Sequence, residues 1–141
     1  MYHTGLSVQT GYSDEVHEII PASPYSDDSN IDWTPNLVKP KDQGVCGSCW
    51  TFCTVGAVEA LYSKVHSQKG STPVVINLSE QLLVDCDRTF LSHGCDGGEM
   101  NEAYDYMIKE GVVLGNDYPY KAANLECKAK SMKFVDWKPK G

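Results

Sequence analysis

The residues best suited to chemistry lie between positions 43 and 50, where the sequence reads Gln-Gly-Val-Cys-Gly-Ser-Cys-Trp. Apolar residues at helical spacing follow Cys49, so this cysteine is expected to begin a helix. A helix N-terminus presents unpaired N–H groups and the positive end of its dipole, which favour a thiolate. Gln43 carries an amide that can donate, beside the backbone N–H of Cys49, to the oxyanion formed when a thiolate attacks a carbonyl. The pattern therefore predicts nucleophilic catalysis by Cys49, with Gln43 as an oxyanion donor.

A cysteine nucleophile also needs a proton acceptor. A helix N-terminus stabilises a thiolate by only about 0.3 to 1 kcal/mol, so an imidazole is required as well. His3 and His17 lie in a polar N-terminal stretch, and His93 lies two residues before Cys95. His66 ends the predicted helix, about 25 Å from the thiol at roughly 1.5 Å per residue. We therefore expect the catalytic imidazole to come from polypeptide outside this sequence.

The helix that follows Cys49 is expected to run to about residue 65. Its apolar and small positions recur every three or four residues, which predicts one buried stripe. The stripe comprises Trp50, Cys53, Ala57, Val58, Leu61, Tyr62 and Val65. Cys53 is interpreted as a small buried hydrophobe, rather than as a thiol that resolves an oxidised Cys49.

Two further helices are predicted. Ser79 is a good N-cap for a short helix in which Leu82 and Leu83 face inward. A third helix begins at Met100, where apolar residues follow the i, i+3, i+4, i+7 template, and Gly111 is placed to end it. No alternating strand pattern is longer than residues 74–76. The fold is therefore expected to be mainly α, with irregular loops held by disulfides.

Composition sets the class of protein. The chain has 141 residues, of which 41% are hydrophobic, and this suits one domain with a single core. Its net charge of -7 argues against nucleic acids and anionic membranes as partners, and no apolar run resembles a signal peptide or a membrane span. Six cysteines favour a disulfide framework and an oxidising compartment, secreted or lysosomal. They are Cys46, Cys49, Cys53, Cys86, Cys95 and Cys127.

Several motifs, in order, make the sequence resemble the papain-like cysteine proteases, in particular the cathepsin L-like branch. They are Asp32-Trp33, Lys41-Asp42-Gln43-Gly44, Cys46-Gly47-Ser48-Cys49-Trp50, Asn77-Leu78-Ser79-Glu80-Gln81, Asp85-Cys86, Gly94-Cys95-Asp96-Gly97-Gly98 and Tyr118-Pro119-Tyr120. The resemblance implies a cysteine-type endopeptidase that hydrolyses peptide or protein substrates through a thioester acyl-enzyme, without a cofactor or metal. It also implies the helical left domain of the papain-like α+β fold.

The resemblance assigns roles to individual residues. Cys49 is the nucleophile, and Gln43 helps to form the oxyanion hole. Substrate-binding roles fall to Gly47, Trp50, Gly97, Gly98 and Met100, the last as one wall of an apolar pocket. The implied disulfide pairing is Cys46 with Cys95 and Cys86 with Cys127, one of three connectivities open to these four thiols.

The resemblance also divides the chain. Residues 1–29 resemble the flexible propeptide tail of a zymogen, residues 30–127 the left domain, and residues 128–141 the start of a crossover to a β-rich right domain. In the family the His and Asn partners lie about 130 to 150 residues after the cysteine, beyond Gly141. The chain alone is therefore expected to be inactive, with the missing right-domain polypeptide as an expected partner.

Other interpretations stay open. The chain could be a non-catalytic, truncated or interaction domain whose apolar face a partner must cover. Cys46 and Cys49 also form a C-x-x-C element, as in redox proteins, but the sequence lacks the β-α-β pattern that accompanies a thioredoxin-like site. A zinc site would need four clustered ligands, and the other cysteines do not form a second C-x-x-C pair. Asn77 begins a possible N-glycosylation sequon, although the same residues are expected to cap a helix.

Overall fold

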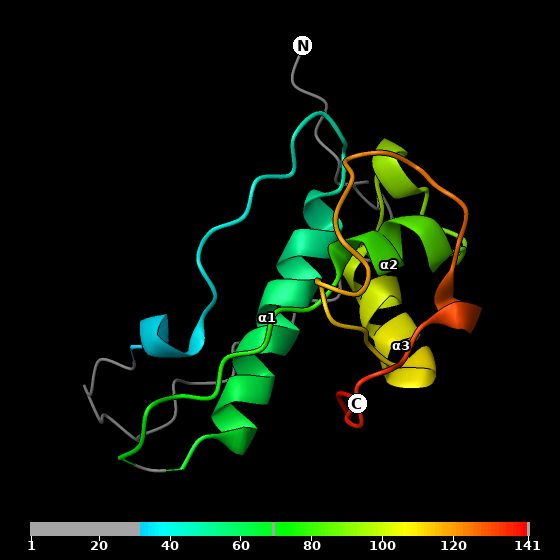
Figure 1. Cartoon of the computed structure of the whole chain (residues 1–141). Helices are drawn as coiled ribbons and strands as arrows, with labels where there is room; N and C mark the ends of the chain where they lie inside the picture. The colour runs from blue at the N-terminus through cyan, green and yellow to red at the C-terminus, as the bar shows by residue number, and fades with distance from the viewer. Residues whose placement is uncertain (1–31, 69, 141) are drawn as a thin grey trace, which may run out of the picture.

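The computed structural model describes residues 32–68 and 70–140. Their α-helices are α1 (Cys49–His66), α2 (Glu80–Cys86) and α3 (Met100–Glu110), and the short 3-10 helices are η1 (Thr34–Asn36), η2 (Gly94–Asp96) and η3 (Ala129–Ser131). The long helix α1 crosses the molecule, and α2 and α3 pack against it (Figure 1). No strand occurs within these two ranges, where one antiparallel bridge joins Leu78 and Leu114. The expectation of a mainly helical fold is confirmed, and the predicted lead at residues 1–29 lies outside the described residues.

The helix ends are set by residues that the sequence indicates. Ser79 precedes α2, and its Oγ accepts a hydrogen bond of 3.1 Å from the backbone N–H of Leu82. Gly111 follows α3 with a φ of 104°, which favours glycine, and its N–H donates to the carbonyl of Met107 at 3.0 Å. These ends confirm the predicted boundaries. None of the described helices is long and apolar enough to cross a membrane.

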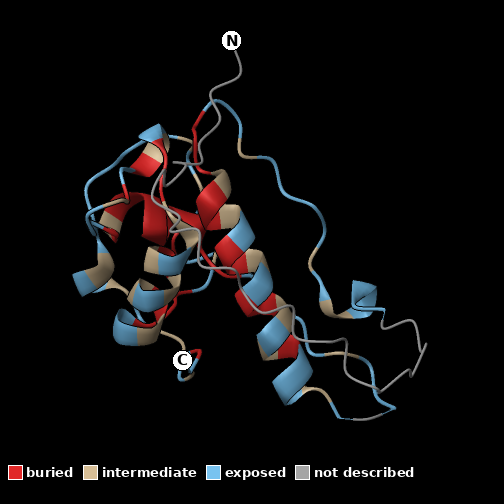
Figure 2. Cartoon of the chain, turned by 180° about the vertical axis from the view of Figure 1, so that it is seen from behind, coloured by how far each residue is buried: buried red, intermediate tan, exposed pale blue. Residues whose placement is uncertain are grey.

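The core lies where α1, α2 and α3 meet. Trp50, Val55 and Val58 of α1 pack in one cluster with Leu83 of α2 and Met107 of α3. Figure 2 shows buried residues concentrated in this region, whereas the far end of α1 and the segment that precedes α1 are mostly exposed. Fully burying a side chain of this size stabilises the fold by roughly 1.5 to 3 kcal/mol relative to leaving it exposed. The cluster is therefore the main apolar support of α1.

The buried face of α1 differs from the predicted stripe. It comprises Trp50, Thr51, Thr54, Val55, Val58, Glu59 and Ser63. The hydroxyls of Thr51 and Thr54 donate to backbone carbonyls of the preceding turn at 2.8 Å, so these polar residues can be buried. Trp50 and Val58 of the predicted stripe are buried, but periodicity alone did not locate the rest of the buried face, because apolar residues surround most of α1. The prediction is wrong at four exposed positions, including the expected buried thiol: Cys53, Ala57, Leu61 and Val65.

Two disulfides hold the loops around these helices. One joins Cys46, in the loop before α1, to Cys95 of η2 across a Cα–Cα distance of 4.7 Å. The other joins Cys86, the last residue of α2, to Cys127 across 4.9 Å. This is the pairing that the family resemblance implies. For loops of this length the chain-entropy estimate is roughly 4 kcal/mol of stability for each bridge.

Candidate active site

Cys49 is a free, half-buried thiol at the first residue of α1. Its neighbour Cys46 is bonded to Cys95, so the C-x-x-C element is not a dithiol in this structure. A thioredoxin-like redox pair would need both sulfurs free to join each other. Within residues 32–68 and 70–140, no three His, Cys, Asp or Glu side chains gather as metal ligands. The loop before α1 thus leaves the thiol of Cys49 available for chemistry.

The N-terminus of α1 leaves a backbone donor at this cysteine. Ser48 is the N-cap, but its side chain makes no capping hydrogen bond to the helix. Its hydroxyl is instead hydrogen-bonded to the hydroxyl of Tyr120. The N–H of Cys49 has no acceptor among the residues that the structure describes. An unpaired N–H at a helix start is suited to binding an oxyanion.

Gln43 is fixed within the loop that leads to this helix. Its Nε2 donates to the carbonyl of Cys46 at 2.9 Å. A side-chain amide nitrogen has two hydrogens, so one remains for a second acceptor. Asp42 accepts from the N–H of Gly44 at 2.8 Å, and the φ of 61° at Gly44 gives a tight turn that glycine allows. The turn and the contact with Cys46 together restrict where the amide can lie.

Tyr120 joins these two parts of the site, although the sequence pattern gives it no role. Its hydroxyl donates to the carbonyl of Gln43 at 2.7 Å and is also hydrogen-bonded to Ser48. Its ring packs edge-on against Phe52 of α1, with ring centroids 4.9 Å apart. The tyrosine hydroxyl is protonated at neutral pH and can donate, and burial raises the pKa of Tyr120 further. Because Tyr120 lies 72 residues after Ser48, no local spacing could reveal this contact.

Trp50 supports a neighbouring loop. Its side chain is 0% exposed, and its assignment as a substrate-binding residue stays a prediction. Its Nε1 donates to the carbonyl of Gly94 at 3.0 Å. A Cβ at Gly98 would lie 2.5 Å from a carbon of the indole ring, closer than side chains tolerate. The buried indole therefore requires glycine at position 98 and holds residues 94–98 against α1.

Two other predicted substrate-binding residues, Gly47 and Gly97, lie close to the disulfide before α1, whereas Met100 lies at the start of α3. The N–H of Gly47 donates to the carbonyl of Cys95 at 2.9 Å. Gly97 ends η2 with a φ of 118°, and its carbonyl accepts from the N–H of His93 at 2.9 Å. Met100 begins α3 and packs, half-buried, against the core. Their contacts with a substrate stay a prediction.

No imidazole is bonded to Cys49 among the described residues. His66 is the last residue of α1, where its ring stacks on Tyr62 with centroids 3.9 Å apart and its Nδ1 lies 2.8 Å from the Tyr62 carbonyl. His93 is exposed and makes no hydrogen bond to the thiol. A general base must lie within hydrogen-bond reach of the proton it accepts. The other two histidines of the sequence lie outside the described residues.

Comparison with known proteins places these features in a family. The sequence pattern described as papain family cysteine protease matches residues 28–139. A probable cysteine protease of Arabidopsis thaliana, RDL2, is 49% identical over 98 residues, which cover 67% of this chain and 25% of that protein. A viral cathepsin of Choristoneura fumiferana nuclear polyhedrosis virus is 38% identical over 138 residues, covering 94% of this chain and 40% of the viral protein.

Solved structures show the same relationship. The Carica candamarcensis cysteine protease CMS1MS2 superposes with a TM-score of 0.66 at 38% identity, covering 74% of this chain and 46% of that one. Recombinant stem bromelain precursor superposes with a TM-score of 0.62 at 36% identity, and the match covers 74% of this chain and 32% of the bromelain chain. The chain thus spans less than half the length of each of these relatives. It belongs to the papain family of cysteine proteases.

Proposed function

We propose that this chain supplies the nucleophile and the oxyanion hole of a cysteine endopeptidase that works through a thioester acyl-enzyme. The observation that carries the proposal is the arrangement at the start of α1. Cys49 is free, whereas Cys46 is bonded to Cys95. The N–H of Cys49 lacks an acceptor in the described part of the chain, and the amide of Gln43 is held in the adjoining loop. Acyl transfer needs these types of nucleophile and donor.

The reaction steps follow from these positions. The thiolate of Cys49 attacks the carbonyl carbon of the scissile peptide bond, and the carbonyl oxygen becomes an oxyanion. The N–H of Cys49 and the second amide N–H of Gln43 donate to that oxygen, and one such donor is worth about 2.7 to 4 kcal/mol in acyl transfer. The amine product takes a proton and departs, so the acyl group stays bonded to the sulfur of Cys49 as a thioester. Water then hydrolyses this thioester.

The proton of the thiol needs an imidazole, and this proposal locates it outside the described residues. Neither His66 nor His93 is bonded to the thiol, and the family resemblance assigns the His and Asn to a β-rich right domain. Residues 30–127 then form the left domain, and residues 128–141 lead towards the right one. The isolated chain is inactive in this account, and activity belongs to the two domains together.

The expected substrates are peptides or proteins. Both disulfides must persist where the protein works, which favours an oxidising compartment, either lysosomal or extracellular. Residues 1–29 act in this proposal as the tail of a zymogen propeptide. One of the solved relatives is a recombinant stem bromelain precursor, so precursor forms occur among the proteins that this chain resembles.

Cys53 offers an internal control for the reactivity of Cys49. Both thiols are free and lie one helical turn apart, and Cys53 is the more exposed. A peptidyl vinyl sulfone should be applied to the chain alone and to the folded chain joined to a papain-family right domain, with the labelled thiol located by mass spectrometry. With the right domain present, Cys49 should react on the order of 10² to 10⁴ times faster than Cys53, the gain expected from a positioned base.

In the chain alone the two rates should differ by less than about thirtyfold, because a helix N-terminus contributes at most about 2 kcal/mol at a partly buried site such as Cys49. Equal rates with the right domain in place would contradict the proposed nucleophile and favour a non-catalytic interaction domain. A large preference for Cys49 in the chain alone would instead contradict the external imidazole.

A further inference from the structure

Two free thiols lie one helical turn apart on α1. Cys49 begins the helix and is half-buried, and Cys53 is exposed. The other four cysteines of the sequence are paired in the two disulfides. Residues four apart in a helix share a face, and their Cβ atoms lie about 5 to 6 Å apart. The helix therefore presents two unpaired thiols as neighbours on one face.

The spacing of these thiols disfavours a disulfide between them. A disulfide needs Cβ atoms about 3.5 to 4.5 Å apart, closer than one helical turn provides. Closing that distance would distort the first turn of α1, which also holds the buried Trp50. An ion bonded to both sulfurs avoids the distortion, because two metal–thiolate bonds of about 2.3 Å span about 4.6 Å when they lie in line. The pair is therefore better suited to hold an ion than to close a disulfide.

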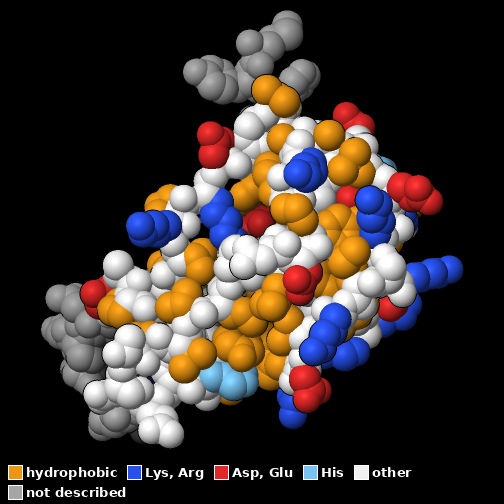
Figure 3. Space-filling view, viewed as in Figure 1, with side chains coloured by type: hydrophobic (Ala, Val, Ile, Leu, Met, Phe, Trp, Pro, Cys, Tyr) orange, Lys and Arg blue, Asp and Glu red, His pale blue; other side chains and the backbone are white. Residues whose placement is uncertain are grey.

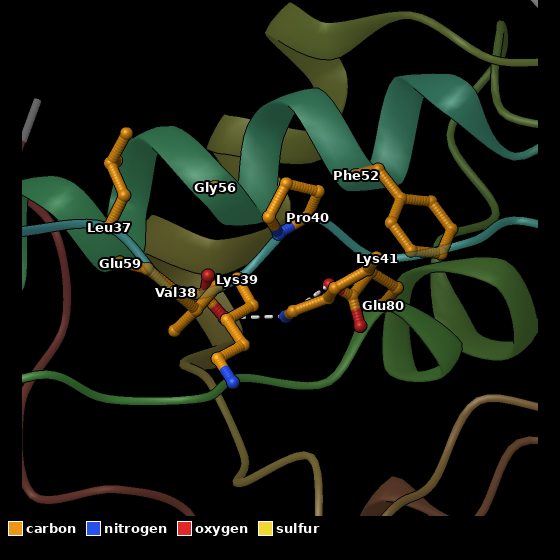
Figure 4. Close-up of a pocket in the computed structure, with 9 residues that line it drawn as sticks. All are labelled: Leu37, Val38, Lys39, Pro40, Lys41, Phe52, Gly56, Glu59 and Glu80. Carbon is orange, nitrogen blue, oxygen red and sulfur yellow. Dashed lines mark hydrogen bonds and ion pairs between the residues drawn. The ribbon is translucent and has the colours of Figure 1, made fainter. Parts of the chain in front are cut away.

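The segment before α1 covers a different strip of the helix. Residues 37–41 lie against α1 with a groove of about 390 Å³ between them. Figure 4 shows Phe52 and Gly56 together on the strip that borders this groove. Cys49 and Cys53 are not among the residues that line it. The exposed thiol of Cys53 therefore gives an ion access from solvent.

The number of ligands limits which ion fits these thiols. Zinc in structural sites takes four protein ligands. In the described part of the chain, no three His, Cys, Asp or Glu side chains gather as metal ligands. Thiolates select soft ions, and monovalent copper is a soft ion that two thiolates in line can satisfy. The N-terminus of α1 favours the thiolate of Cys49, which is the form that binds a metal.

We propose that Cys49 and Cys53 bind one monovalent copper ion between their sulfurs. Each thiol releases its proton to solvent as its bond to copper forms, so two protons leave for each ion bound and nothing is oxidised or reduced. The ion occupies the sulfur of Cys49 and so blocks the reactions of that thiol with carbonyls and alkylating reagents. The site requires only the two free thiols, so it does not depend on the proposed protease chemistry.

The test uses the 141-residue chain and monovalent copper, supplied without oxygen as its coloured complex with bathocuproine disulfonate. The absorbance of this complex falls as the protein takes the copper, which gives the number of ions bound and the affinity. The unchanged chain should take one ion. A vinyl sulfone should then label neither thiol until excess chelator removes the copper. The control is the same chain with both free thiols alkylated beforehand, which should take no copper.

Two variants test whether the spacing of the thiols matters. Cys53→Ser should weaken copper binding more than about a hundredfold, because even residues that only support a metal ligand contribute up to this factor. The matched control combines Cys53→Ser with Ala57→Cys, which keeps two free thiols and moves the second to another exposed position. That position lies about 12 Å from Cys49 along the helix at roughly 1.5 Å per residue, so this control should bind as weakly as Cys53→Ser.

Three results would overturn the proposal. The unchanged chain and the alkylated chain could take copper equally, which would place the ion elsewhere. The spacing control could bind copper as tightly as the unchanged chain. Sedimentation could show that copper joins two chains, which would assign the site to a pair of copies.

The comparison with the alkylated chain needs no variant, so the proposal can be rejected even where a variant does not fold. Labelling of Cys49 in the two-domain protein without copper tests the proposed function separately. Failure of the copper site therefore leaves that test intact.

Discussion

The two sides of α1 differ in how completely the chain covers them. On the inner side, Trp50 and Val55 are fully buried in the core shared with α2 and α3. Other positions of α1, among them Cys53, Ala57 and Leu61, are exposed. The space-filling view likewise shows hydrophobic side chains at the surface over much of the face seen in Figure 1 (Figure 3). The chain therefore completes the packing that supports the helix on one side only.

This difference bears on the site at the start of α1. The parts that hold Cys49 in place come from within the chain, through the Cys46–Cys95 disulfide and the Tyr120 hydroxyl. The part that would accept its proton is absent from the described residues. In the proposed enzyme, structural support and catalytic completion have separate origins, and the predictions below test this separation.

The largest expected effect concerns how much buried and exposed apolar residues contribute to the stability of the fold. Leu83→Ala, within the core, should lower the free energy of unfolding by about 2 to 5 kcal/mol. Leu61→Ala, at a position 41% exposed, should lower it by less than about 0.5 kcal/mol. Urea denaturation followed by tryptophan fluorescence measures both. Similar losses would show that the outer side is already packed in the chain alone.

The second prediction concerns Gln43 as an oxyanion donor. In the chain joined to a right domain, Gln43→Ala should lower kcat roughly 10²- to 10³-fold with little change in KM, because the donor acts mainly in the transition state. Gln68→Ala, which changes a residue beyond the far end of α1, is the matched control. A rise in KM at unchanged kcat would instead make Gln43 a substrate-binding residue.

The third prediction concerns Tyr120 as a positioning residue. Tyr120→Phe keeps the packing against Phe52 and removes the hydroxyl that bonds Gln43 and Ser48. Labelling of Cys49 in the two-domain protein should slow by about two- to tenfold, the range expected for one ordinary hydrogen bond.

The control for this change is Tyr118→Phe. It removes a hydroxyl that donates to Asp85 at 2.8 Å in a different buried network. It should cost stability and leave the labelling rate of the folded protein unchanged. Equal slowing in both variants would reduce the role of Tyr120 to general stability.

The smallest expected effect is a dependence of stability on pH that arises at Glu59. Burial raises the pKa of Glu59 in the folded chain above the ordinary value of 4.5, which applies to the unfolded chain. Between the unfolded-state pKa and the higher folded-state pKa, the folded chain binds more protons than the unfolded chain. The free energy of unfolding should therefore fall as the pH rises through this interval. Glu59→Gln should remove that part of the slope in urea titrations at several pH values. A slope unchanged by Glu59→Gln, or equally reduced by Glu110→Gln, would contradict the assignment.

The sequence predicts those features that depend on neighbours along the chain. The helix start at Cys49, the cap at Ser79 and the glycine stop at Gly111 follow from local backbone requirements, and the structure confirms all three. The exposure of Cys53 is set by which side of α1 meets α2 and α3, and apolar spacing does not specify that. The link through Tyr120 joins segments far apart in sequence, so a single sequence contains no signal for it.

The state of the sulfur atoms tests the central claim most directly. Non-reducing peptide mapping of the folded chain, after alkylation of its free thiols, shows which cysteines are paired. We predict bonds between Cys46 and Cys95 and between Cys86 and Cys127, with alkylated Cys49 and Cys53. A bond between Cys46 and Cys49 in the folded protein would contradict the account, because it would remove the nucleophile.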